Sequence, residues 1–216
     1  MNLKPKSLEM KSALIGMILG DAYLRKTKTS KNAYMTINHG IKQIEYEEWK
    51  NAILQNITNT KIEQRMVYLK KENKSYPQIT LITRTHPIYT KLHNQIYING
   101  RKSITLNLLK QLTPLGMAIW YMDAGGLIFH KCKLKNGNNG IKSRELCLNT
   151  QSFSYEEHLI IQKYFKEVWD IDIRINKSKN AFRIIMNATN AKKFINIIKP
   201  YIIPSMQYKI DMKYKQ

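Results

Sequence analysis

The chain has 216 residues, 43% of them hydrophobic, which is enough for a buried core and excludes a disordered basic tail. Its 36 Lys and Arg residues against 15 Asp and Glu give a formal net charge of +21, which favours nucleic acid as partner over a membrane surface. No apolar run is long enough to cross a membrane, and Cys132 and Cys147 lack metal-ligand spacing and fit a reduced compartment.

The first half of the chain opens with a nearly apolar, helix-like run over residues 13–23 that contains Gly16, Gly20 and Asp21. Gly16 and Gly20 are four residues apart, so they share a helix face and allow close backbone approach. The elements expected after this run are a basic turn over 23–32, a strand over 33–38, an amphipathic helix over 43–57, a hairpin of 62–70 with 76–83, and a helix over 87–98.

The second half repeats this order, beginning with an apolar run over 116–126 that contains Asp123 and Ala124. A capping box of Ser154 and Glu157 predicts the start of its middle helix. The elements expected are strands over 127–132 and 144–149, a helix over 154–169, a hairpin of 172–176 with 182–187, and a helix over 191–199. We therefore predict two similar halves, 1–102 and 103–216, with their boundary near residues 99–113.

The chemistry follows from placing the two apolar runs side by side, because this brings their C-terminal ends together. Carboxylates at these electronegative ends repel each other unless a cation such as Mg²⁺ is present, and Mg²⁺ can support phosphodiester hydrolysis. Lys102 follows Asp21 at nearly the same offset as Lys209 follows Ala124. A nearby lysine would stabilise developing charge or orient water.

Each of these features has a plainer interpretation when it stands alone. An apolar helix ending in Gly-Asp is usually a core helix, Lys102 alone is a solvated lysine, and Trp120 is most simply a core aromatic. The five histidines have no ligand spacing, which argues against zinc. Only the combination of duplication, acidic helix ends, matched lysines and high charge indicates a nuclease.

Four segments of the sequence resemble the LAGLIDADG homing endonucleases, specifically the monomeric, two-motif kind encoded in organellar group I introns. Residues 19–24 (Leu-Gly-Asp-Ala-Tyr-Leu) are similar to the first motif, and residues 112–123 are similar to the second. Residues 148–157 and 198–209 also resemble this subfamily. The resemblance implies an α+β fold of two αββαββα units, in which two curved antiparallel sheets form a DNA-binding saddle over the packed motif helices.

The resemblance also implies an activity. A monomer would bind a long, asymmetric double-stranded DNA site and cut both strands to leave 3′ overhangs, using Mg²⁺ or Mn²⁺, with Ca²⁺ as a non-cleaving substitute. Asp21 would be a metal-binding catalytic acid, with Lys102 and Lys209 as active-site lysines. The backbone carbonyls of Gly20 and Asp123 would complete the metal site.

The departure from the family pattern is Ala124, which stands where the second catalytic Asp is expected. Asp123 lies about 100° away around the helix, so we expect it to point elsewhere, toward helix packing or capping. Cleavage of at least one strand should be impaired. Ala124 could be an engineered inactivating change, natural decay of an endonuclease, or the mark of a group I intron RNA maturase. A non-catalytic nucleic-acid-binding protein, with host intron RNA as partner, is therefore the alternative function.

DNA contacts are expected from the strands and their turns, where lysines grip phosphates and strand side chains read base edges. The start of the chain does not look like a transit peptide, and the richness in Ile, Asn and Lys is typical of an AT-rich organellar genome. We therefore expect a mitochondrial origin, with the chloroplast as alternative. The candidate contact residues are Arg25, Lys26, Lys28, Lys31, Thr36, Asn38, Arg65, Lys70, Lys71, Arg84, Lys131, Lys133, Lys135, Arg144, Arg174, Lys177, Lys179 and Arg183.

Overall fold

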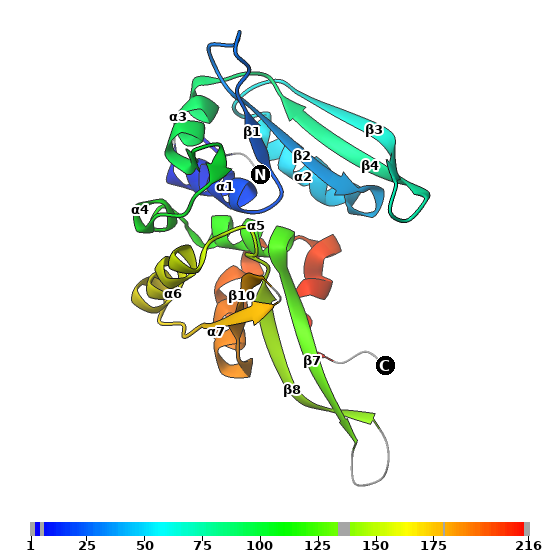
Figure 1. Cartoon of the computed structure of the whole chain (residues 1–216), viewed down its shortest axis with the longest axis vertical. Helices are drawn as coiled ribbons and strands as arrows, with labels where there is room; N and C mark the ends of the chain where they lie inside the picture. Colours follow the sequence, from blue (N-terminus) through cyan, green and yellow to red (C-terminus); the bar gives the residue numbers. More distant parts are fainter. Residues whose placement is uncertain (1–2, 5–6, 134–138, 179, 214–216) are drawn as a thin grey trace.

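The computed structural model describes residues 3–4, 7–133, 139–178 and 180–213. Its first half is an antiparallel sheet covered on one face by helices. Its strands lie in the order β1-β2-β4-β3 (Figure 1). Its elements are α1 (Leu8–Leu19), β1 (Tyr23–Arg25), β2 (Tyr34–Gly40), the short 3₁₀ turn η1 (Ile41–Gln43), α2 (Ile44–Leu54), β3 (Thr60–Leu69), β4 (Lys74–Thr83) and α3 (Pro87–Ile96).

The second half repeats this arrangement, with its strands in the equivalent order β7-β8-β10-β9. Its elements are α5 (Pro114–Ala124), β7 (Gly125–Lys133), β8 (Asn139–Leu148), α6 (Tyr155–Trp169), β9 (Arg174–Ser178), β10 (Ala181–Met186), α7 (Ala188–Ile198), and the 3₁₀ turns η2 (Lys199–Tyr201) and η3 (Pro204–Lys209). The predicted α+β fold of two αββαββα units is confirmed.

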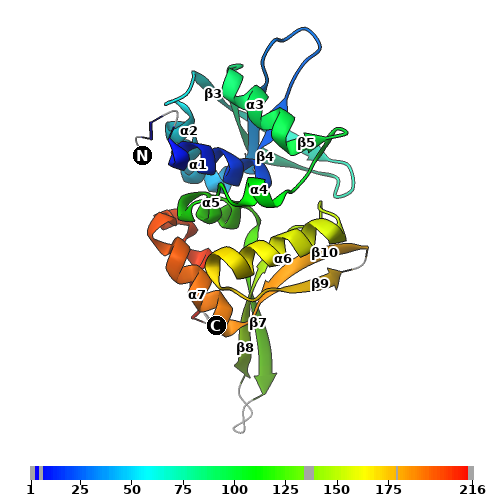
Figure 2. The same ribbon diagram turned by 90° about the vertical axis from the view of Figure 1, so that its left-hand side faces the viewer.

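The two halves meet at α1 and α5, which lie side by side between the two sheets (Figure 2). A Cβ atom at Gly16 would lie 2.2 Å from the carbonyl oxygen of Gly116, and one at Gly116 would lie 2.2 Å from Ser12 Oγ. Glycine is therefore required at both positions for the backbones to approach this closely. The Ser12 hydroxyl also accepts a hydrogen bond of 2.7 Å from the backbone N–H of Thr113, just before α5.

The link between the halves holds a hairpin that the sequence patterns did not predict. The helix expected to reach residue 98 ends at Ile96, because Tyr97–Ile98 (β5) pairs with Arg101–Lys102 (β6). Asn99 and Gly100 turn this hairpin with φ of 50° and 78°, the two positive values that a type I′ turn needs. The short helix α4 (Leu106–Leu109) then leads to α5.

Two strand boundaries also differ from those expected. The basic stretch over 23–32 was expected to be a turn, but Tyr23–Arg25 forms the edge strand β1, paired with β2. The return strand expected at 144 begins five residues earlier, at Asn139. Basic residues concealed the first strand, and the Asn, Gly and Ser residues typical of turns concealed the start of the second.

The buried residues form a hydrophobic cluster that runs through both halves, from Met10 in α1 to Ile210 after η3. The division at residues 102 and 103 stays a prediction. Among the described residues, none of the helices combines the length and apolarity that crossing a membrane requires.

We predict that Gly16→Ala lowers the free energy of unfolding by about 1–3 kcal/mol, because its new methyl group collides with a backbone carbonyl that cannot move aside. Urea denaturation followed by circular dichroism measures this change. Gly40→Ala is the matched control, since a Cβ there meets nothing within 4 Å. Equal stability of the two variants would contradict the close packing of α1 on α5.

Candidate active site and nucleic-acid interface

The C-terminal ends of α1 and α5 form the candidate centre. Asp21 follows the capping residue Gly20, and its side chain is 46% exposed. Ala124 is the last residue of α5 and is half-buried against the core. A Cβ atom at Gly20 would lie 2.2 Å from Asp123 Oδ2, so the two helix ends touch at this point. The structure therefore brings the two motif ends together.

The two lysines selected from the sequence reach this centre in matching ways. Lys102, on β6, donates from Nζ to the carbonyl oxygen of Gly20 at 3.2 Å. Lys209, at the end of η3, donates from Nζ to the carbonyl of Asp123 at 3.3 Å and to that of Met122 at 2.5 Å. Each ammonium group thus lies on the carbonyl that precedes position 21 or position 124, where a cation is favoured by the helix C-terminus.

Burial shifts the charges in this centre. Burial lowers the pKa of Lys102 to about 8, although the carboxylates of Asp21 and Asp123 raise it in part. Burial also lowers the pKa of Lys209. Burial and, after it, the Asp123 carboxylate raise the pKa of Asp21. A cation bound at Asp21 would favour the charged form of this carboxylate, which burial disfavours.

The Asp123 side chain lies in the contact between the two motif helices. Its side chain is fully buried and turns toward the other motif helix, where Oδ2 accepts a hydrogen bond of 3.1 Å from the backbone N–H of Asp21. This bond fits the expected role of Asp123 in helix packing or capping. The approach of the two helices at Gly20 is the physical reason for this bond, because it brings the Asp123 side chain over the end of α1.

Sequence reasoning missed three buried polar residues beside this centre, His39 on β2 and Glu47 and Lys50 on α2. Lys50 Nζ lies 2.6 Å from Asp123 Oδ1 and 2.9 Å from His39 Nε2, while Glu47 Oε2 lies 3.3 Å from His39 Nε2. Burial lowers the pKa of His39 to about 4 and raises that of Glu47 to about 7. The helical period could have revealed two of them, since Glu47 and Lys50 share the stripe of Tyr46 and Ile53.

The oxygen atoms at the helix ends fit a hard divalent cation. The half-exposed Asp21 carboxylate and the carbonyls of Gly20 and Asp123 are the kind of donor that Mg²⁺ and Ca²⁺ prefer. Ala124 contributes no side-chain ligand, and its carbonyl already accepts a hydrogen bond of 2.9 Å from the N–H of Asn149. The residues present therefore fit a cation on the Asp21 side better than one on the Ala124 side.

The outer face of the first sheet, opposite α2 and α3, carries several predicted contact residues. The strand register places Arg25, Thr36, Asn38 and Arg65 on this face, because Met35 and Ile37 alternate with them toward the core. Arg65 Nη2 and Thr80 Oγ1 both donate to Asn38 Oδ1, at 3.4 and 2.7 Å. The exposed residues at its ends and turns are Lys26, Lys28, Lys31, Lys70, Lys71 and Arg84.

The remaining candidate contact residues lie on both faces of the second sheet. Arg174 and Arg183 lie on its outer face, where Arg174 Nη2 pairs with Glu145 Oε1 at 3.1 Å. Arg144 and Lys177 lie on the opposite, helix-packed side, because Arg144 shares the strand face of buried Leu146 and Lys177 is paired with Phe182, which packs on α6. Their strand faces therefore do not favour groove contact. Lys131 and Lys133 are exposed on β7, and Lys135 and Lys179 lie outside the described residues.

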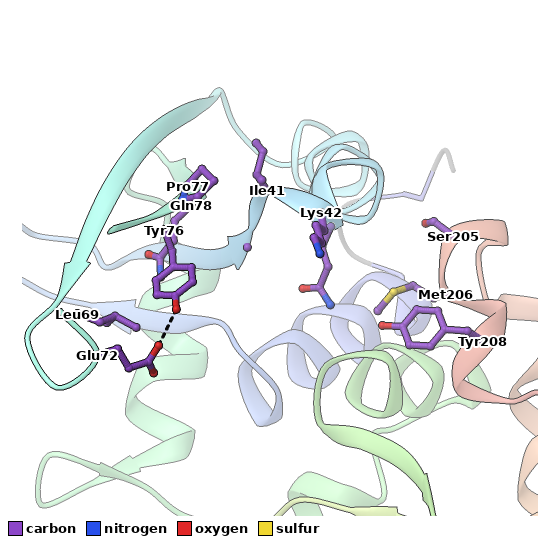
Figure 3. Close-up of a pocket in the computed structure, with 12 residues that line it drawn as sticks. Ile41, Lys42, Leu69, Glu72, Tyr76, Pro77, Gln78, Ser205, Met206 and Tyr208 are labelled. Carbon is purple, nitrogen blue, oxygen red and sulfur yellow. Dashed lines mark hydrogen bonds between the residues drawn. The ribbon is translucent and has the colours of Figure 1, made fainter. Parts of the chain in front are cut away.

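A hollow of about 830 Å³ lies between the tip of the β3–β4 hairpin, η1 and η3 (Figure 3). Leu69 and Tyr76 line it from the hairpin, Lys42 from η1, and Met206 and Tyr208 from η3. None of the predicted catalytic residues lines it, so it is separate from the candidate centre.

The paired motif helices, the two outer sheet faces and the matched lysines define a class of duplicated nucleic-acid-binding protein. Residues 11–194 match the LAGLIDADG DNA endonuclease family. The chain belongs to this family. Family membership and the fold together suggest a nuclease.

The solved structures with a similar fold include DNA complexes. The chain superposes on the homing endonuclease I-WcaI bound to its DNA recognition sequence with a TM-score of 0.85 and 26% identity, over 96% of this chain and 88% of that one. The endonuclease I-SmaMI, solved with uncleaved DNA in the presence of calcium ions, has a TM-score of 0.54 at 11% identity over 92% of this chain and 86% of that one, a likeness of fold alone.

Two kinds of curated relative align with nearly the whole chain. RecA of Mycolicibacterium chitae is 29% identical over 94% of this chain, and the chain spans 46% of that protein. The cytochrome b mRNA maturase bI2 of Debaryomyces hansenii is 28% identical over 96% of this chain and 75% of the maturase. The chain thus spans about half the length of the RecA relatives it matches.

Glu47 should make the stability of the native chain depend on pH. The pKa of Glu47 is about 7 in the folded chain and 4.5 in the unfolded chain, so the folded state binds the proton more tightly. This contribution to the free energy of unfolding is complete below pH 4.5 and is lost as the pH rises through 7. We expect Glu47→Gln, relative to the native chain, to gain stability between pH 4.5 and 7. Urea denaturation across this range measures the difference.

The matched control is Glu48→Gln, the same change at the exposed neighbouring position on α2. A Glu47→Gln curve that runs parallel to the native curve across the whole pH range would contradict a raised pKa at Glu47.

Proposed function

We propose that the chain is the scaffold of a site-specific DNA endonuclease that hydrolyses phosphodiesters on both strands of a long, asymmetric site and leaves 3′ overhangs. The observation that carries this proposal is the equivalent placement of Lys102 and Lys209 on the carbonyls of Gly20 and Asp123. Two unrelated core helices would have no reason to receive one half-buried lysine each at the same carbonyl.

Asp21 and the carbonyls of Gly20 and Asp123 would hold the divalent cation, Mg²⁺ or Mn²⁺, with Ca²⁺ as a non-cleaving substitute. A bound cation supplies charge neutralisation and a more acidic water. Lys102 and Lys209 stabilise negative charge on the phosphate oxygens that approach the helix ends. Burial lowers the pKa of Lys102 to about 8, which makes this lysine better able to exchange a proton near neutral pH, and it also lowers the pKa of Lys209.

Ala124 makes the two strand-cutting positions unequal. On the first motif Asp21 supplies a carboxylate, whereas on the second motif the nearest carboxylate, Asp123, is buried and already bonded to Lys50 and to the Asp21 amide. Asp123 is therefore not free to take the place of the missing acid. We infer that the chain as written grips DNA and cuts it poorly.

The outer sheet faces would lie in the major groove. Arg25, Asn38 and Arg65 on the first sheet and Arg174 and Arg183 on the second are the proposed base-contacting residues. The lysines of the turns would neutralise phosphates. Because both motif helices belong to one chain, the centre is complete in a monomer.

A second candidate function is that of a non-catalytic nucleic-acid-binding protein, such as a group I intron RNA maturase. Two observations favour it, the Ala at position 124 and the relatives named cytochrome b mRNA maturase in Debaryomyces hansenii and Saccharomyces cerevisiae. The same relatives support a mitochondrial origin over a chloroplast one, and the mycobacterial RecA relatives add a bacterial setting as a further candidate.

We predict that Ala124→Asp raises Mg²⁺-dependent double-strand cleavage by at least about 100-fold, because a restored metal-binding carboxylate contributes several kcal/mol to the transition state. The substrate is obtained by selecting duplexes from a randomised library with the unaltered chain. It is then cloned into a supercoiled plasmid, so that nicked and linear products report one and two strand cuts.

Asp21→Asn in the Ala124→Asp background is the matched control and should abolish the gained activity. An Ala124→Asp chain that binds the selected site tightly yet produces neither nicked nor linear plasmid with Mg²⁺ would count against the endonuclease. Splicing of a group I intron that depends on the unaltered chain would instead support the maturase.

DNA affinity should fall steeply with salt, with a slope set by the number of phosphates neutralised. Lys70→Met, at the exposed tip of the first sheet, should reduce that slope by about one with little change in sequence preference. Fluorescence anisotropy at several salt concentrations measures it. Lys163→Met, an exposed lysine on α6 paired with Glu167, is the control and should leave the slope unchanged. Affinity independent of salt would refute a polyanion partner.

A further inference from the structure

The buried charges behind the candidate centre have no part in the chemistry described so far. Lys50 and Asp123 have fully buried side chains, and His39 is 3% exposed. Burying a lysine is costly unless its charge is paired, so its presence at this position requires a reason. Lys50 is contributed by the first half of the chain and Asp123 by the second, which makes the pair a link between the two halves.

The Asp123 carboxylate connects two elements through its two oxygens. Oδ1 accepts from Lys50 Nζ at 2.6 Å, and Oδ2 accepts from the backbone N–H of Asp21 at 3.1 Å. Lys50 Nζ is fixed in turn by His39 Nε2 at 2.9 Å and by the Tyr46 ring, whose centroid lies 4.2 Å away. A chain of contacts therefore runs from α2 through Asp123 to the residue that carries the exposed acid.

A metal ion bound by this cluster is the competing interpretation. Single ligand atoms of Asp21, His39 and Asp123 lie within 4.8 Å of one another. The ammonium of Lys50, however, is already bonded to Asp123 Oδ1 and lies at hydrogen-bond distance from His39 Nε2. A divalent ion on the same atoms would have to displace a buried cation, so Lys50 takes the position that a metal would need.

We propose that Lys50 is a positioning residue, which locks the Asp123 carboxylate over the end of α1 and thereby fixes Asp21 for cation binding. Lys50 acts as a built-in cation of the scaffold, in contrast to the exchangeable cation at Asp21. The part of this proposal that concerns cation binding rests on the proposed function, whereas the link from Lys50 to the Asp21 amide does not.

Hydrogen exchange measured by NMR tests the link without any metal. The amide of Asp21 donates to Asp123, while the neighbouring amide of Gly20 donates to Gly16 within α1. Lys50→Met should speed exchange at Asp21 about tenfold or more relative to Gly20, because a general loss of stability would affect both amides. An unchanged ratio would overturn the proposal. Lys163→Met is the matched lysine control.

Mn²⁺ titration followed by electron paramagnetic resonance tests the consequence for Asp21. Positioning predicts that Lys50→Met weakens Mn²⁺ binding about 10–100-fold, as for other residues that orient a ligand. A purely electrostatic role predicts the opposite, since removing a nearby positive charge favours a cation at Asp21. Unchanged or tighter binding therefore overturns the proposal. Asp21→Asn identifies the binding that belongs to this site.

The double variant Lys50→Met/Asp123→Asn supplies the rescue. Lys50→Met alone leaves a buried carboxylate without its counter-charge and should lower the melting temperature by about 10 °C. The double variant removes both charges and keeps an oxygen for the Asp21 amide, so it should melt higher than Lys50→Met and regain Mn²⁺ binding. If Lys50→Met does not fold, a folded double variant supports the proposal, and an unfolded one overturns it.

Failure of the proposed endonuclease and failure of the positioning role of Lys50 give different results. If the unaltered chain shows no Mn²⁺ binding that Asp21→Asn abolishes, the proposed cation site of the endonuclease fails. The exchange ratio of Asp21 to Gly20 and the melting temperatures still decide whether Lys50 positions Asp21. If instead Mn²⁺ binds at Asp21 in every Lys50 variant alike, the endonuclease proposal stands and the positioning role is lost.

Discussion

The close contact of α1 with α5 is the constraint on which the rest of the structure depends. Gly16 and Gly116 let the two backbones meet without side chains between them. The apolar middle of each helix is buried, from Ser12 to Leu19 in α1 and from Leu115 to Met122 in α5, so the acids of the centre lie where both helices end. The two sheets lie on either side of this pair, and their outer faces flank the helix ends (Figure 1).

Two helix C-termini lie close together, which concentrates negative electrostatic potential, and three lysine ammonium groups lie beside them. Lys102 and Lys209 neutralise the terminal carbonyls, and Lys50 neutralises the Asp123 carboxylate. Each of these lysines comes from an element outside the two motif helices. The centre is therefore assembled by tertiary contacts, which explains why no short segment of the chain could carry it alone.

The sequence was most informative where a pattern repeats. Apolar runs, the capping box and the duplicated order of elements predicted the fold, and the offsets of Lys102 and Lys209 predicted that both would reach the same centre. Prediction failed where tertiary context overrides local signals. The Asn99-Gly100 turn ended α3 early, and the Glu-rich start of α2 resembles a solvated face although Glu47 and Lys50 are buried. Helical rotation indicated that Asp123 turns toward packing or capping, but it could not show which helix lies opposite.

Ala124 affects the proposed cleavage of DNA without affecting the residues proposed to bind it. In the proposed function, DNA contact depends on the outer sheet faces and the turns, whereas metal-dependent hydrolysis depends on acids at the helix ends. The buried Asp123 joins α5 to α2 through Lys50 and to the end of α1 through the Asp21 amide. A chain without an acid at 124 can thus keep its fold and its basic surface, while one without Asp123 would leave the buried Lys50 without a carboxylate. The two adjacent positions are therefore under different physical constraints, one set by chemistry and one by packing.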